Sequence, residues 1–208
     1  LAGVSAFLDG AEANAGEAGG DIYFAMENVT GSGFADRLGG NQADNAVSGG
    51  VGNDTLFGRA GADVLDGGAD NDALDGGSEN DFLAGGAGND TLTGGVGNDI
   101  LVGGEGADFY QGGADVDVAF FRSVTSGITV NMANPGANTG EAVGDTFAAD
   151  VENLWGSDFN DILTGSSVGG QVYGFNGNDQ LTGQAGGDVF YGGLGGDTIT
   201  SGAGADDY

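Results

Sequence analysis

A nine-residue period runs through most of the chain and constrains its fold more than any other feature. Glycine recurs at every ninth residue from Gly31 to Gly112 without a slip. In that frame, the eight consecutive sixth positions from Asp54 to Asp117 are aspartate, and every eighth position is apolar. A second array with the same pattern begins at Gly156. A fixed period of this length predicts a repetitive solenoid instead of an ordinary globular core.

The stretches outside the two arrays also repeat. The segment from Gly16 to Asp21 matches the segment from Gly140 to Asp145, and a Glu-Asn pair follows in both copies. The chain therefore contains two copies of one unit, and because the second copy stops inside a repeat we expect it to be an excerpt from a longer protein. We predict four segments: a truncated spacer or capping segment over 1–30, a first array over 31–120, a second spacer or capping segment over 121–155, and a truncated second array over 156–208.

The geometry of one repeat, GGVGNDTLF from Gly49, follows from its residue types. Its last three residues predict a strand just long enough to point one leucine inward, because successive side chains alternate between faces. Its first six residues predict a turn, since glycine supplies backbone angles closed to other residues. Two turns and two strands make a coil of 18 residues, so each repeat lies over the repeat two further along the chain. The sixth-position aspartates are then predicted to form two walls.

Charge indicates what such walls need. The chain has 32 acidic and three basic residues, with a formal net charge of −29. Carboxylates stacked every ~5 Å repel by roughly 0.8 kcal/mol per neighbour in water, and more strongly near an apolar surface. A hard divalent cation between successive carboxylates, completed by backbone carbonyls, would replace this repulsion with attraction. Calcium suits a flexible shell rich in carbonyls better than magnesium does. The chain has no His and no Cys, which argues against zinc and copper.

The predicted metal ligands are the sixth-position aspartates of both arrays. They are Asp54, Asp63, Asp72, Asp81, Asp90, Asp99, Asp108, Asp117, Asp161, Asp179, Asp188, Asp197 and Asp206. One ion for each stacked pair gives about nine Ca²⁺ ions, with a gap where Gly170 interrupts one wall. Nine such ions would reduce the net charge to about −11.

Other classes of function fit the sequence poorly. Nucleic-acid binding needs clustered Lys and Arg, which this chain lacks. No apolar run is long enough for a membrane-inserted helix. We predict that Glu17, Glu27, Glu141 and Glu152 bond the spacers to the roll instead of serving as an acid/base pair, so no enzyme activity is expected.

The aromatic residues of the spacer region predict a small core where the spacer covers the end of a roll. These residues are Phe120, Phe121, Phe147, Trp155 and Phe159.

The repeats GGVGNDTLF, GGAGNDTLT, GGVGNDILV and GGLGGDTIT resemble the calcium-binding nonapeptide of the RTX (repeats in toxin) family, also called the hemolysin-type repeat. The resemblance implies an all-β fold, a right-handed parallel β-roll. It also implies a bacterial protein exported by type I secretion that folds when it meets millimolar calcium outside the cell.

We therefore expect a calcium-binding segment of a large secreted or cell-surface protein, acting in calcium-triggered folding and as a rigid structural or adhesive spacer. Its partners would be calcium ions, with a surface polysaccharide or other copies of the protein as further candidates. The alternative is an accessory module, for polysaccharide binding or for secretion and folding, of an exoenzyme such as a protease, lipase or alginate epimerase. An exposed groove lined by cations or aromatic rings would favour that alternative. Ice binding is disfavoured because the third positions carry no threonine.

Overall fold

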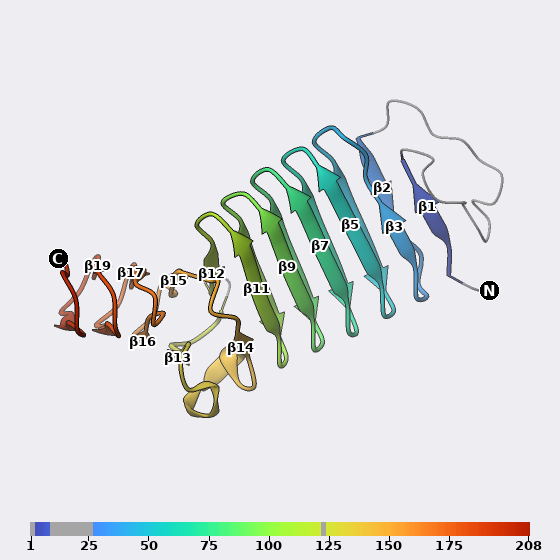
Figure 1. Cartoon of the computed structure of the whole chain (residues 1–208). Helices are drawn as coiled ribbons and strands as arrows, with labels where there is room; N and C mark the ends of the chain where they lie inside the picture. The colour runs from blue at the N-terminus through green and yellow to red at the C-terminus, as the bar shows by residue number, and fades with distance from the viewer. Residues whose placement is uncertain (1–2, 9–26, 122–123) are drawn as a thin grey trace.

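The computed structural model describes residues 3–8, 27–121 and 124–208, which form one elongated stack of parallel strands (Figure 1). Besides strands, the described residues contain two short 3₁₀ helices, η2 (Pro135–Ala137) and η3 (Gly140–Ala142). The predicted all-β solenoid is thus confirmed. No helix among the described residues is both long enough and apolar enough to cross a lipid bilayer.

Three parallel sheets run along the stack. The seven-stranded sheet contains, in order, β1 (Ser5–Phe7), β3 (Arg37–Gly39), β5 (Thr55–Ala60), β7 (Ala73–Ser78), β9 (Thr91–Val96), β11 (Phe109–Ala114) and β14 (Thr146–Phe147). The nine-stranded sheet contains β2 (Asn28–Thr30), β4 (Ala46–Val51), β6 (Val64–Ala69), β8 (Phe82–Ala87), β10 (Ile100–Glu105), β12 (Val118–Phe120), β15 (Asn153–Trp155), β17 (Gly170–Tyr173) and β19 (Asp188–Tyr191). The four-stranded sheet contains β13 (Thr129–Asn131), β16 (Ile162–Thr164), β18 (Gln180–Thr182) and β20 (Thr198–Thr200).

The strands pair with partners 18 residues away, as the period predicts. Leu56 of β5 lies beside Leu74 of β7, and Val47 of β4 lies beside Leu65 of β6. Between the facing sheets of the first array, each repeat contributes one buried side chain to the core. The core therefore consists of two facing ladders of side chains, one from each sheet. Its members in the first array are buried: Leu38, Val47, Leu56, Leu65, Leu74, Leu83, Leu92, Leu101, Tyr110 and Ala119.

The strands of the first array are longer than predicted. β4 to β11 each have six residues, because the first three residues of each repeat continue the strand and leave a three-residue turn. Within the strand, pairing is interrupted at the first glycine of the repeat, Gly49, and resumes at the second glycine. There Gly50, with φ +107°, pairs with Gly68. A side chain at Gly68 would collide with the Gly50 carbonyl, so only glycine allows this close approach. In the second array the strands keep three or four residues, and four of the six corresponding residues lack this left-handed backbone: Ser157, Ser166, Gln184 and Gly202.

The spacer interrupts one sheet and leaves another continuous. The nine-stranded sheet passes from β12 through β15 to β17 without a gap. On the opposite side, β14 ends the seven-stranded sheet, and β13 begins the four-stranded sheet by pairing with β16. The excursion that contains β13, η2 and η3 projects from the side of the stack in Figure 1. The second array is therefore a continuation of the first along one face.

The aromatic side chains of the spacer divide between two places. Phe121 and Phe147 pack around the buried Tyr110 at ring separations of 5.9 and 4.9 Å, which confirms the expected core at the end of the first roll. The prediction is wrong for Phe120 and Trp155. They lie at the end of their strands and pack on each other at 5.5 Å and on Phe175. Phe159 is 42% exposed, so it also lies outside that core.

Four non-glycine residues of the first array carry left-handed backbone at positions where other repeats have glycine. They are Arg59, Asp70, Glu79 and Asp115, with φ between 74° and 88°. Such a backbone is costly for a residue with a Cβ atom. These departures from the repeat therefore keep its geometry and carry strain.

We predict that Asp70→Gly raises the stability of the calcium-loaded protein by up to about 1 kcal/mol, because it removes this strain from an exposed turn residue. Thermal unfolding in excess calcium measures the change. Glu79→Gly is the matched control. It relieves the same strain but loses the bonds that the Glu79 carboxylate accepts from Gly61 N–H and the Ser78 hydroxyl, so its gain should be smaller. A fall in melting temperature for Asp70→Gly would instead mean that the Asp70 carboxylate contributes to the loaded state.

Candidate metal centre

The sixth-position aspartates form two hydrogen-bonded ladders in the first array. In each step, a carboxylate Oδ1 accepts the backbone N–H of the sixth-position residue 18 positions earlier, at 2.7–2.9 Å. We define the first wall as Asp36, Asp54, Asp72, Asp90 and Asp108, and the second wall as Asn45, Asp63, Asp81, Asp99 and Asp117.

The second array repeats this arrangement. Asp161, Asp179 and Asp197 make one ladder, with steps of 2.9 and 3.1 Å. Asp188 and Asp206 make a step of 3.0 Å on the other side. The structure thus places every predicted ligand in a stacked ladder with at least one other.

The second carboxylate oxygen of most of these residues is buried without a hydrogen-bond partner. This holds for Oδ2 of Asp54, Asp63, Asp72, Asp81, Asp90, Asp99, Asp108, Asp117 and Asp179, and for Oδ1 of Asp188. A buried carboxylate oxygen without a partner is expensive, and natural proteins rarely leave one uncompensated. Nine such Oδ2 atoms at equivalent positions indicate that the folded chain is built to receive a positively charged group there.

A backbone carbonyl oxygen lies on the same side of the turn as each of these carboxylates. A Cβ atom at Gly49 would collide both with Asp54 Oδ2 and with the carbonyl oxygen of Gly67, and the next repeats show the same pair of obstacles. The first-position glycine is therefore required because a carboxylate and a carbonyl oxygen converge on it. Calcium accepts this mixture of donors, and the residues present fit it.

Side chains alone would not complete a metal site. Within the described part of the chain, no group of three or more acidic side chains gathers around one point that could hold a metal. Any cation held by the walls must therefore take backbone carbonyls along with carboxylates.

Burial raises the pKa of the wall aspartates from Asp54 to Asp117, and that of Asp179 in the second array. The pKa of Asp63, Asp108 and Asp179 rises to about 6, and that of Asp72, Asp81 and Asp117 rises to about 7. Loss of hydration is the largest cause, neighbouring carboxylates add to it, and the accepted backbone N–H opposes it. Without a cation, these groups hold protons far more readily than free aspartate does.

The spacer extends both walls with residues that the nine-residue spacing did not predict. Asp145 Oδ1 accepts the N–H of Asp108 at 2.9 Å, and Glu152 Oε2 accepts the N–H of Asp117 at 3.0 Å. Each has the place of a sixth-position aspartate, but the sequence separations of 37 and 35 residues hide it. The only available signal was the repeated GEA..GD and Glu-Asn pattern of the spacers.

The other glutamates of the spacers also bond to backbone. The carbonyl of Glu27 accepts the N–H of Ala46, and the carboxylate of Glu141 accepts the N–H of Thr125 at 3.3 Å. Glu27 and Glu152 thus bond their spacers to the roll, as expected, whereas the Glu141 bond stays within the spacer because Thr125 lies there too. Glu17 lies outside the described residues.

A second ladder of amides runs beside the first wall in the opposite direction. Asn71 N–H donates to Asn53 Oδ1 at 3.0 Å, and Asn89 N–H donates to Asn71 Oδ1 at 2.6 Å. In the aspartate ladders the donor lies earlier in the chain, whereas here it lies later. Each turn is therefore tied in both directions to its neighbours.

This geometry defines a class of protein, a parallel β-roll whose turns carry ladders of incompletely bonded carboxylates. Residues 27–56, 39–74, 48–83, 75–110, 84–119 and 173–208 match the family model of the RTX calcium-binding nonapeptide repeat. These segments cover more than half of the chain, and the chain belongs to this family. The chain matches no curated protein.

Acidification is predicted to stabilise the calcium-free roll. The wall carboxylates have a higher pKa in the folded state than in the unfolded chain, so protonation favours folding. That stabilisation is complete below about pH 4 and is lost as the pH rises through 6 to 7. Far-ultraviolet circular dichroism in a chelator should show β-structure increasing as the pH falls from about 8 to about 5.

The same protons compete with calcium for the carboxylates. The calcium affinity of the folded chain should therefore fall as the pH falls through this range. A calcium-free chain that loses β-structure on acidification, as proteins stabilised by ionised carboxylates do, would contradict the assignment of these pKa shifts.

Proposed function

We propose that this chain is a non-enzymatic calcium-binding β-roll segment of a large secreted or cell-surface bacterial protein, which folds when it meets calcium and then serves as a rigid structural or adhesive spacer. The single observation that supports it best is the set of buried, unbonded carboxylate oxygens in the stacked walls. The repeats belong to a calcium-binding family, and their walls offer the carboxylate oxygens that calcium binds.

The proposed ligands are the thirteen sixth-position aspartates predicted from the sequence, together with carbonyl oxygens of the adjacent turns. In the wall aspartates from Asp54 to Asp117 and in Asp179, a backbone N–H already engages Oδ1, so Oδ2 is the oxygen left for the cation, whereas in Asp188 the unbonded oxygen is Oδ1. Calcium supplies positive charge that offsets repulsion along the ladder. About nine ions would leave a net charge of about −11.

Calcium dependence also bears on where the protein works. Calcium-binding modules outside the cell work with dissociation constants of about 10⁻⁴–10⁻³ M. A chain of net charge −29 has little drive to condense without cations, so it would remain unfolded until it meets such a concentration. An extracellular or cell-surface location, reached by type I secretion, fits that behaviour.

A calcium titration tests the proposal. Circular dichroism should show a coil becoming β-sheet, and small-angle scattering should show compaction, with magnesium failing to replace calcium. A chelator-treated sample at neutral pH that keeps the compact shape would contradict the proposed role of calcium.

The stacked arrangement predicts the effect of one ligand change. Asp90→Ala removes a carboxylate shared by two neighbouring sites, so we expect fewer bound ions and a lower melting temperature in calcium. Isothermal titration calorimetry and thermal unfolding measure both. Asp66→Ala is the charge-matched control, because Asp66 is exposed and lies outside the walls. Equal calcium stoichiometry and melting temperature for wild type and Asp90→Ala would contradict the wall assignment.

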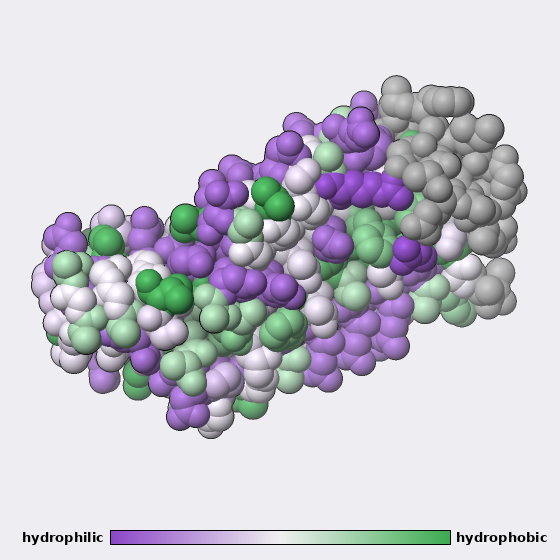
Figure 2. All heavy atoms as spheres, in the orientation of Figure 1, coloured by the Kyte–Doolittle hydropathy of each residue, from purple (hydrophilic) through white to green (hydrophobic). Residues whose placement is uncertain are grey.

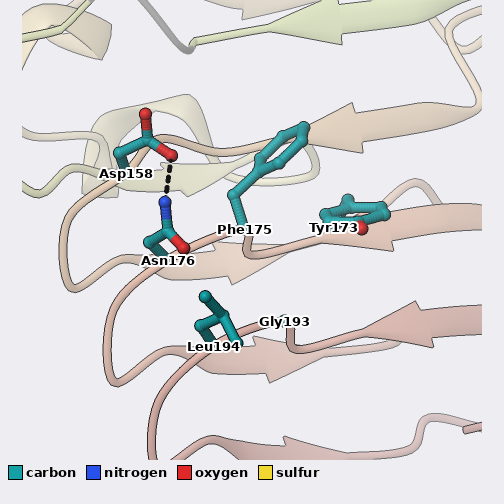
Figure 3. Close-up of a pocket in the computed structure, with 6 residues that line it drawn as sticks. All are labelled: Asp158, Tyr173, Phe175, Asn176, Gly193 and Leu194. Carbon is teal, nitrogen blue, oxygen red and sulfur yellow. Dashed lines mark hydrogen bonds between the residues drawn. The ribbon is translucent and has the colours of Figure 1, made fainter.

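One observation favours a second candidate function, that of a polysaccharide-binding accessory module. An open hollow of about 470 Å³ is lined by Asp158, Tyr173, Phe175, Asn176, Gly193 and Leu194 from successive turns of the second array (Figure 3). The rings of Tyr173 and Phe175 lie 4.3 Å apart, and the amide of Asn176 donates to Asp158 at 2.7 Å. Flat apolar faces beside polar groups suit sugar rings.

The charge of this hollow favours an uncharged glycan. Its charged member is the acidic Asp158. The cations Arg37 and Arg59 lie in the first array, where Arg37 stacks 4.4 Å above the Phe57 ring and Arg59 lies 5.3 Å from the Phe7 ring. Arg122 lies outside the described residues. An acidic polysaccharide would therefore meet repulsion here.

Affinity electrophoresis tests this second candidate. In calcium, a neutral β-linked glucan in the gel should retard the wild type, and Tyr173→Ala should abolish the retardation. Phe82→Ala is the control, because it removes an exposed phenylalanine of the first array. Equal mobility of wild type and Tyr173→Ala in the glucan gel would count against a glycan site, as would stronger retardation by an anionic glycan.

A further inference from the structure

The first wall ends at a turn that differs from all the turns before it. The sequence from Gly103 to its wall residue Asp108 has six residues, whereas the corresponding sequence of the next coil, from Phe121 to Asp145, has 25. The additional residues form the excursion that carries β13, η2 and η3. At the far end of the excursion, β14 returns to pair with β11, with Thr146 opposite Phe109.

Asp145 continues the wall across this long turn. It is completely buried, and its Oδ1 accepts the Asp108 N–H at 2.9 Å, as in every earlier step. The N–H of Thr146 donates to the Asp108 carbonyl at 2.8 Å, which repeats the bond from Phe109 to Asp90. The excursion is thus joined to the roll with the backbone geometry of a regular repeat.

A tyrosine hydroxyl replaces the glycine carbonyl at this step. In earlier repeats, the first-position glycine faces the carboxylate Oδ2 of its own repeat and the carbonyl of the glycine 18 residues further on. The residue 18 positions after Gly103 is Phe121, which is no glycine. Here a side chain at Gly103 would collide with Asp108 Oδ2 and with the hydroxyl of Tyr110.

The hydroxyl of Tyr110 is oriented by its other contacts. The Gly103 N–H donates to the hydroxyl oxygen at 2.9 Å, and the hydroxyl in turn donates to Asp145 Oδ2 at 3.5 Å. The Tyr110 ring is fully buried between Phe121 and Phe147. Asp108 is 1% exposed, and its Oδ2 has no hydrogen-bond partner.

We propose that Asp108, Asp145 and the Tyr110 hydroxyl form a further calcium site, which closes the first array and fixes the excursion to it. This inference rests on the proposed calcium-binding function. It adds one ion to the number obtained from the nine-residue spacing. It also assigns a role to a spacer aspartate and to a tyrosine at a position that the other repeats of the first array fill with an aliphatic residue. Three oxygen donors from the two ends of the long turn suit a hard divalent cation.

Two conservative variants test the site in the full chain. Asp145→Asn keeps an oxygen that can accept the Asp108 N–H but removes the charge, and we expect it to bind one calcium ion fewer per chain by equilibrium dialysis with metal analysis. Tyr110→Phe keeps the ring packing and removes the hydroxyl. We expect it to weaken one site on the order of tenfold.

Terbium provides a readout of proximity, because it occupies calcium sites and emits when a nearby aromatic ring is excited. Tyrosine-sensitised terbium emission should fall in Tyr110→Phe and stay unchanged in Tyr173→Phe, whose ring lies in the hollow of the second array. Asp158→Asn, which changes an exposed carboxylate outside the walls, should bind the wild-type number of ions.

The outcomes separate this inference from the proposed function. If the wild type binds neither calcium nor terbium, both are overturned. If it binds ions but Asp145→Asn and Tyr110→Phe match it in stoichiometry, affinity and emission, only the closing site is overturned. If Asp145→Asn does not fold in calcium, Tyr110→Phe decides, since its core packing is preserved.

Discussion

Every other feature of this molecule depends on the stacking of buried carboxylates at the step between rungs. Parallel pairing at a separation of 18 residues places each wall aspartate directly beside the next. Because the register is fixed, these side chains cannot move apart without breaking the strand pairing. From Asp54 to Asp117, one oxygen of each wall carboxylate is satisfied by backbone, and the other is buried without a hydrogen-bond partner. The hydrophobic core is only one ladder of residues deep on each side, so it offers limited compensation. A bound cation or a proton would offset the cost of these unbonded oxygens.

Glycine and asparagine make this crowding geometrically tolerable. First-position glycines leave room for a carboxylate and a carbonyl, and second-position glycines let the backbone bend while pairing continues on both sides. The asparagine ladder joins the same turns in the opposite direction. The turns are thus as regular as the strands, although they contain little apolar material (Figure 2).

The sequence predicted the walls well because their spacing is strictly local. A residue such as Asp72 is placed by counting alone, and the structure stacks it where the period requires. Strand length was not predictable by counting, because it depends on backbone angles such as that of Gly50. Asp145 was not predicted because the excursion separates it from Asp108 by 37 residues instead of 18. Only the folded structure places Asp145 one rung after Asp108. The aromatic cluster of Phe120 and Trp155 was misplaced for a similar reason, since its partner Phe175 belongs to a later rung.

The direction of the strands has a mechanical consequence. The strands lie across the long axis of the stack (Figure 1), so tension between the two ends loads the contacts from one rung to the next. Each rung touches only its neighbours, and such assemblies yield one unit at a time. A tether of this construction would lengthen in small successive increments under load and would recover by adding rungs back onto whatever remains folded. Because β12, β15 and β17 pair without a gap, the hydrogen bonds of the nine-stranded sheet would transmit such tension from the first array to the second.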